Sequence, residues 1–96
     1  MKKKEIVEIM VVKLKKELLF NYSYYQTLGG IQILYNKYIE KYEDRKQYQN
    51  MKRNILNSLY TELCTEKSYK ILFNENEDFS SYNHLINLLE DRSKML

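Results

Sequence analysis

Residues 3–20, KKEIVEIMVVKLKKELLF, decide the fold class of this chain. Apolar side chains recur in this segment every three or four residues, and this spacing places them on one face of an α-helix. The face is formed by Val7, Met10, Val11, Leu14 and Leu18. Ile9 and Val12 lie on the other side, and a helix that is apolar on two sides is typical of a central position in a bundle or of an oligomer contact. We therefore predict a helix from about Lys3 to Phe20.

Three further segments repeat this spacing and predict helices over about 31–47, 50–66 and 81–94. Ser80 or Ser81 is suited to cap the last of them, because a serine oxygen accepts from the free amides of a first turn. The expected core positions are Ile31, Leu34, Tyr35, Tyr38, Ile39 and Tyr42, then Ile55, Leu56, Leu59, Tyr60 and Leu63, and then Tyr82, Leu85, Ile86 and Leu89. Amphipathic helices joined by short connections pack as antiparallel neighbours. The sequence therefore predicts an all-α, antiparallel four-helix bundle that occupies residues 1–96 as one domain.

The connections are identified by breaks in this pattern. Gly29 and Gly30 are expected to close a loop that starts at Asn21, because glycine weakens the interior of a helix. Residues 69–73 are apolar and favour strand structure, but they are too few to form a sheet alone, so they either extend the third helix or form a packed loop. An acidic turn is expected over 74–78. The first loop also holds three tyrosines that form either a contact surface or an aromatic plug, namely Tyr22, Tyr24 and Tyr25.

Composition limits the class of protein. The chain has 96 residues with two Gly, no Pro and one Cys, and so few turn residues argue against a strand-rich fold. The single Cys64 leaves no internal disulfide and favours a reducing compartment. Charged residues interrupt every apolar stretch, so neither a signal peptide nor a transmembrane helix is expected. Lys2, Lys3 and Lys4 form either a frayed, solubilising tail or a weak attraction to an anionic membrane surface, and they are not enough to hold the chain there.

No group of residues predicts catalysis or metal binding. The chain has one Cys and one His, Cys64 and His84, and these two alone do not make a zinc site. Nothing in their spacing marks them as neighbours, as a nucleophile and its base would have to be. The glycine pair lacks the spacing and the lysine of a phosphate-binding loop. We therefore expect a binding protein that is not an enzyme and that uses no metal and no cofactor.

The outward side of the fourth helix is the candidate partner-binding surface. Its polar stripe is formed by His84, Asn87, Asp91 and Lys94. Leu88 and Met95 flank the expected core stripe, and apolar residues in such positions belong either to a wider core or to a partner site. We include both residues in the candidate surface.

Several stretches of the second half carry a family resemblance. They are Arg53–Tyr60 (RNILNSLY), Thr65–Lys67 (TEK), Phe79–Tyr82 (FSSY) and Leu85–Glu90 (LINLLE). Together with the lysine-rich start and the apolar spacing of 31–41, they make the chain resemble the immunity proteins of class IIa (pediocin-like) bacteriocins, particularly the enterocin A immunity group. The segment 69–78 departs from that pattern and looks like an insertion between the third and fourth helices.

The resemblance implies a function in Gram-positive bacteria. Such proteins are cytosolic antiparallel four-helix bundles that protect the producing cell from its own bacteriocin. The implied partner is the mannose phosphotransferase permease with bacteriocin bound, met from inside the cell. Because the family's specificity lies largely in the carboxyl-terminal half, we hypothesise that the fourth helix and the tail after it supply specificity here. We expect a cytoplasmic monomer or weak dimer with no nucleic-acid partner, and proximity to the inner face of the membrane stays open.

Two other classes of function also stay open. A small helical DNA-binding regulator from a phage or plasmid needs a helix with an exposed basic face, and the third helix offers only Lys52 and Arg53 near its start. An oligomeric structural protein or an inhibitor would use the second apolar side of the first helix, at Ile9 and Val12.

Overall fold

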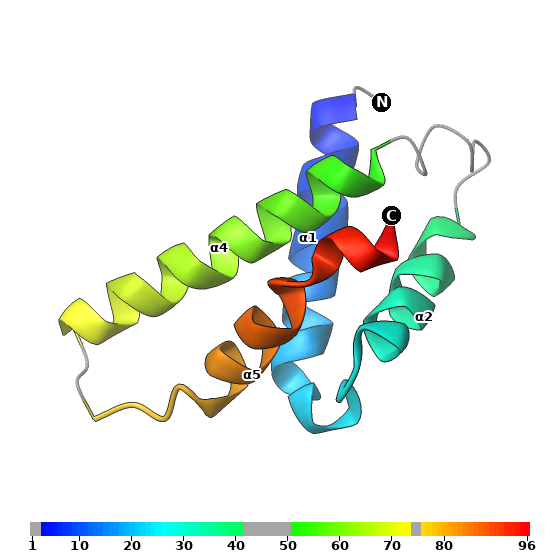
Figure 1. Cartoon of the computed structure of the whole chain (residues 1–96). Coiled ribbons are helices and arrows are strands. Elements are labelled where there is room, and N and C mark those ends of the chain that lie inside the picture. Colours follow the sequence, from blue (N-terminus) through cyan, green and yellow to red (C-terminus); the bar gives the residue numbers. More distant parts are fainter. Residues whose placement is uncertain (1–2, 42–50, 74–75) are drawn as a thin grey trace.

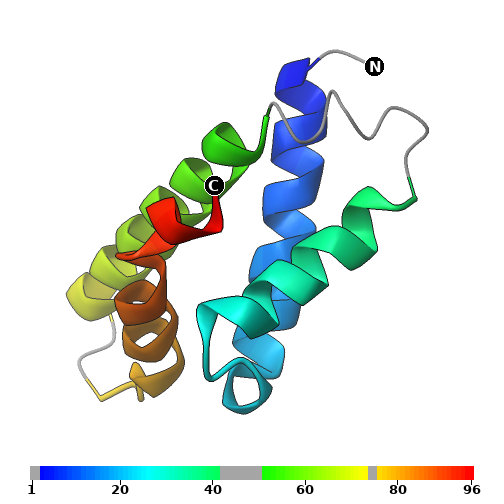
Figure 2. The same ribbon diagram turned by 45° about the vertical axis from the view of Figure 1, so that its right-hand side comes forward.

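The computed structural model describes residues 3–41, 51–73 and 76–96, and within these ranges the chain is all-α with no strand. Successive long helices run in opposite directions, so the predicted antiparallel helical bundle is confirmed (Figures 1 and 2). The elements are α1 (Lys3–Phe20), the 3-10 turn η1 (Tyr22–Tyr24), α2 (Leu28–Ile39), α4 (Lys52–Phe73), α5 (Ser80–Leu89) and the 3-10 turn η2 (Arg92–Met95). The first predicted helix has the bounds that the sequence indicated.

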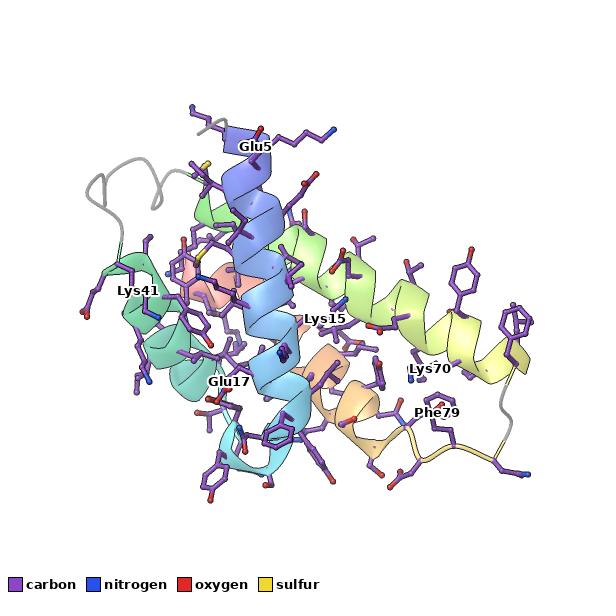
Figure 3. The ribbon with its side chains drawn as sticks, turned by 180° about the vertical axis from the view of Figure 1, so that it is seen from behind. Glu5, Lys15, Glu17, Lys41, Lys70 and Phe79 are labelled. Atoms are coloured by element: carbon purple, nitrogen blue, oxygen red, sulfur yellow. The ribbon has the colours of Figure 1, made fainter. Side chains whose placement is uncertain are left out.

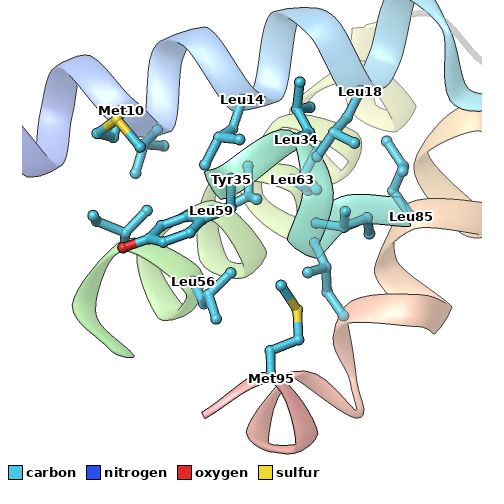
Figure 4. Packing of buried hydrophobic residues seen from close by; sticks show 14 of the residues in the cluster. Met10, Leu14, Leu18, Leu34, Tyr35, Leu56, Leu59, Leu63, Leu85 and Met95 are labelled. Carbon is cyan, nitrogen blue, oxygen red and sulfur yellow. The ribbon is translucent and has the colours of Figure 1, made fainter. Parts of the chain in front are cut away.

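The core lies where α1, α2, α4 and α5 meet, with α1 packed chiefly against α4 and α4 against α5. Figure 4 shows the side chains of Leu14, Leu59 and Leu85 converging from three helices, with Tyr35 reaching in from α2. Most predicted core positions are buried. Among the described positions, the exceptions are half-buried and pack on the edge of the core, namely Val7, Tyr38, Tyr60 and Ile86. The core also holds Ile6, Met51 and Met95, which the periodicity did not place there.

The glycine pair does not break the chain as predicted. Gly29 and Gly30 belong to the first turn of α2, and neither has a positive φ. Thr27 is the N-cap, and its Oγ1 accepts a hydrogen bond of 3.3 Å from the amide of Gly30. Amides of a first turn have no partner within the helix, so this side-chain acceptor lets the helix begin before the apolar stripe does. The prediction that Gly29 and Gly30 belong to a loop is therefore wrong.

At its other end α2 stops at Ile39, and residues 40–41 form a turn. The predicted continuation over 42–47, including the core position Tyr42, lies outside the described residues.

The helix predicted over 50–66 begins at Lys52 and continues to Phe73. Of the two structures that the sequence left open for Tyr69–Phe73, the extension of this helix is confirmed. Residues 74–75, part of the predicted acidic turn, lie outside the described residues. The described remainder of that turn, 76–78, together with Phe79, forms a turn, a bend and an irregular stretch before α5.

The last predicted helix is divided in two. α5 ends at Leu89, and the chain then turns into η2. The Arg92 side chain explains this division, because its Nη1 donates to the carbonyl oxygen of Leu89 at 3.0 Å while its other contacts are on α4. A helix continued to Lys94 would carry Arg92 and Met95 away from these positions.

Candidate binding surface

The amino-terminal end of α5 is held by an aspartate and not by one of the predicted serine caps. Phe79 occupies the N-cap position and makes no capping hydrogen bond through its side chain. Asp78 Oδ1 instead accepts from the Ser80 hydroxyl at 2.6 Å and from the Ser80 amide at 2.9 Å. These bonds, the hydroxyl first, lower the pKa of Asp78. A carboxylate at this end also interacts favourably with the positive end of the helix dipole.

His84 fastens the middle of α5 to the loop after α1. Its Nε2 lies 2.7 Å from the carbonyl oxygen of Tyr25, and its ring meets the Tyr22 ring edge-on, with centroids 5.9 Å apart. Tyr22 and Tyr25 pack against the core, whereas Tyr24 is 80% exposed. Two of the three loop tyrosines therefore form the aromatic plug, and His84 rests on that plug instead of projecting freely.

Three of the predicted partner-binding residues form an accessible polar strip on α5 and the turn after it. Asn87, Asp91 and Lys94 are all exposed. Lys94 Nζ lies 3.9 Å from Asp91 Oδ2, and both side chains are mostly in solvent, where such a pair contributes little to stability. We name Asn87, Asp91 and Lys94 the α5 strip.

The two apolar residues of the predicted surface lie toward the core. Met95 is 9% exposed and belongs to the core cluster, and Leu88 is half-buried against the same cluster. The structure therefore separates the six candidate residues into an exposed polar strip, an anchored histidine and two apolar residues that widen the core.

Arg92, which the sequence analysis did not single out, fixes the tail of the chain on α4. Its guanidinium carbon lies 4.2 Å from the centroid of the Tyr60 ring, and its Nε donates to Asn57 Oδ1 at 2.7 Å. Arginine stacks on aromatic faces through a cation–π interaction. A hollow of about 260 Å³ adjoins this contact and is lined by Arg53, Leu56, Asn57, Glu90, Arg92, Ser93 and Leu96. Because Arg92 and Tyr60 are 32 residues apart, helical periodicity could not have revealed their pairing.

A second accessible surface lies at the carboxyl end of α4. Tyr69, Leu72 and Phe73 are 61%, 76% and 82% exposed, and α4 extends well past the start of α5 in Figure 1. A hollow of about 300 Å³ is lined by Cys64, Thr65, Ser68, Tyr69 and Leu72. Lys70 turns the other way, and its Nζ donates to Glu77 Oε1 at 3.0 Å, a bond that raises the pKa of Lys70. We name Tyr69, Leu72 and Phe73 the α4 tip.

The described residues contain no group of three or more metal-ligating side chains, counting His, Cys, Asp and Glu. Cys64 is half-exposed beside the hollow near the α4 tip, whereas His84 contacts Tyr22 and Tyr25. Another hollow, of about 360 Å³, lies between α1 and α4 and is lined by Val7, Glu8, Val11, Asn57, Ser58, Thr61 and Glu62.

Over residues 3–41, 51–73 and 76–96, no helix has both the length and the apolar character needed to cross a bilayer. Comparisons with protein-family models, with curated proteins and with solved structures find no significant match to this chain.

Proposed function

We propose that this chain is an immunity protein that protects its producer from a pediocin-like bacteriocin. It acts by binding and not by catalysis. The partner is the bacteriocin-bound mannose phosphotransferase permease, reached from the cytosol. The sequence resemblance motivates the proposal, and the all-α antiparallel fold is compatible with it.

The observation that carries the proposal is the way in which the α5 strip is held. His84 binds the loop after α1 one turn before Asn87, and Arg92, between Asp91 and Lys94, stacks on Tyr60 of α4. Asn87, Asp91 and Lys94 are therefore presented on a backbone that is held at two points. A surface already in its bound conformation loses less conformational entropy on association, which favours affinity and specificity.

Protection of living cells tests the function directly. The chain is expressed in a sensitive Gram-positive strain, and the strain is challenged with a panel of pediocin-like bacteriocins. We expect survival against one or two of them. If a folded and abundant protein gave no protection across a broad panel, the proposal would be wrong.

A matched pair of variants tests the role of the α5 strip. Asn87→Ala, Asp91→Ala and Lys94→Ala together should abolish protection, because they remove an amide, an acid and a base from the strip. The control combines Asn54→Ala, Glu8→Ala and Arg53→Ala, which remove the same three kinds of exposed side chain elsewhere. Both variants should unfold at the temperature of the parent. Equal protection by the two would show that specificity lies outside the strip.

The start of α4 does not support the DNA-binding alternative, because one of its two basic residues is buried. Lys52 is only 7% exposed, its Nζ donates to Gln32 Oε1 at 2.6 Å, and it lies 5.3 Å from the centroid of the Tyr35 ring. Burial lowers the pKa of Lys52. One of the two basic residues that would have to meet phosphates is thus engaged inside the protein.

A further inference from the structure

The outer side of α1, next to α2, combines basic and apolar side chains. A hollow of about 300 Å³ lies there, lined by Lys13, Lys16, Glu17, Phe20 and Tyr38. Figure 3 views this side, with α1 in front, α2 beside it and α5 behind, and with Glu17 and Lys41 labelled. The lining of this hollow includes no residue of the α5 strip or of the α4 tip.

Positive charge dominates around this hollow. Lys13 and Lys16 are exposed, and Lys41 Nζ lies 5.3 Å from the centroid of the Tyr38 ring. The one carboxylate among the lining residues, Glu17, is turned to its own helix end, where Oε1 accepts from Asn21 Nδ2 at 3.1 Å and from the Tyr25 hydroxyl at 3.3 Å. The three exposed lysines therefore outnumber the two carboxylates near them, namely the hydrogen-bonded Glu17 and the exposed Glu40, which precedes Lys41 in the sequence.

Two apolar side chains of α1 project on the same helix side. Phe20 is 83% exposed and Val12 is 56% exposed. Their spacing from Lys13 and Lys16 places them along the outer stripe of the helix. We name Val12, Lys13, Lys16, Phe20 and Lys41 the α1–α2 face.

We propose that the α1–α2 face binds the anionic surface of a lipid membrane. The lysines would lie at the level of the phosphate groups, and Phe20 would enter the boundary with the acyl chains, as in helices that lie in the membrane interface. An acidic protein segment is the less suitable occupant, because Phe20 borders the hollow with 83% of its surface exposed, so its ring is itself the apolar group that would enter a partner. A membrane interface can accept that ring and the lysines together. The proposal does not depend on the immunity function.

The strength of the interaction can be bounded. A lysine near an anionic membrane raises the partition coefficient about fivefold, and the effect falls away within a Debye length. Lys13, Lys16 and Lys41 together give an enhancement on the order of 100-fold for anionic over neutral membranes. Binding is therefore reversible and depends on salt.

Tryptophan fluorescence locates the contact, since the chain has no native tryptophan. Phe20→Trp places the reporter on the α1–α2 face, and Phe73→Trp places it on the α4 tip, which is just as exposed. Each protein is mixed with vesicles of phosphatidylcholine, with or without phosphatidylglycerol. We expect a blue shift for Phe20→Trp with the anionic vesicles alone, reversed at high salt, and no shift for Phe73→Trp.

Charge-reversal variants test whether vesicle binding depends on the lysines of the α1–α2 face or only on the net charge of the protein. Lys13→Glu with Lys16→Glu should lower vesicle binding by at least about 25-fold in sedimentation. Arg53→Glu with Lys67→Glu changes the net charge equally at two positions on α4, the first exposed and the second half-buried, and most of the binding should remain. Circular dichroism and thermal unfolding confirm that both double variants are folded.

Four outcomes would overturn the proposal. Equal binding to neutral and anionic vesicles would show that the charges of the lysines do not drive binding. A shift for Phe73→Trp alone would assign the contact to the α4 tip. If both double variants lost vesicle binding equally, the binding would depend on net charge and not on the α1–α2 face. A shift of Phe20→Trp with polyglutamate, but not with anionic vesicles, would identify an acidic protein as the partner.

Discussion

Tyr35 is the residue whose ionisation should affect stability most clearly. Its side chain is fully buried, and burial raises its pKa from 10.0 to about 12. The folded state therefore keeps the phenol proton over a pH range in which the unfolded chain loses it. The contribution is fully present below pH 10 and is lost as the pH rises toward 12, with a loss of about 1 kcal/mol by pH 11. Urea unfolding of the parent and of Tyr35→Phe at pH 9 and 11 measures this contribution. The free energy of unfolding should fall less between these two pH values in Tyr35→Phe than in the parent.

The comparison isolates Tyr35 because other titrating groups are common to both proteins. Burial lowers the pKa of Lys52, an effect that acts in the opposite direction as the pH rises. Phenylalanine retains the ring beneath Lys52 and removes only the hydroxyl. Tyr24→Phe, at a position that is 80% exposed, serves as the control and should decline like the parent. An identical decline in Tyr35→Phe would show that this phenol does not titrate as its burial implies.

At the scale of the element, the start of α2 depends on the cap at Thr27. Thr27→Ala removes the oxygen that accepts from the Gly30 amide, and it should lower the free energy of unfolding by about 1 kcal/mol. Thr27→Ser keeps the oxygen and should stay within a few tenths of a kcal/mol of the parent. Chemical denaturation of the three proteins measures the difference. Equal stability of the alanine and serine variants would mean that water replaces the cap.

The elements also show what the sequence could predict. α1 was placed correctly because its stripe continues without interruption from one end to the other. The start of α2 was placed too late, at Ile31 instead of Leu28. Its first turn depends on one side-chain acceptor, Thr27, and apolar periodicity contains no information about such a contact. The exposure of Asn87 was predicted from helical spacing, whereas Asp91 and Lys94 are exposed beyond the end of α5, where that spacing no longer applies. The contact between His84 and Tyr25 could not be predicted from the sequence, because the two residues are 59 positions apart and meet only through tertiary packing.

At the scale of the whole molecule, stability rests on a single core shared by α1, α2, α4 and α5. Leu59 on α4 has no exposed surface, so Leu59→Ala should lower the free energy of unfolding by about 2–5 kcal/mol. Val12→Ala removes an apolar group that is 56% exposed, and it should change stability by less than about 0.5 kcal/mol. Denaturant titration compares them. A small loss for Leu59→Ala would mean that the neighbouring helices close the cavity.

The α4 tip has a consequence for behaviour at high concentration. Residues 69–73, YKILF, join β-prone aromatic and aliphatic residues with one lysine, and they are helical without tertiary cover over most of their side chains. Helix ends fray, and a frayed segment of this composition can pair in extended form with its counterpart on another molecule. Cross-β assembly would then start from the folded protein through local unfolding of this helix end. The time before a concentrated solution aggregates would therefore depend more on how stably residues 69–73 remain helical than on the global free energy of unfolding.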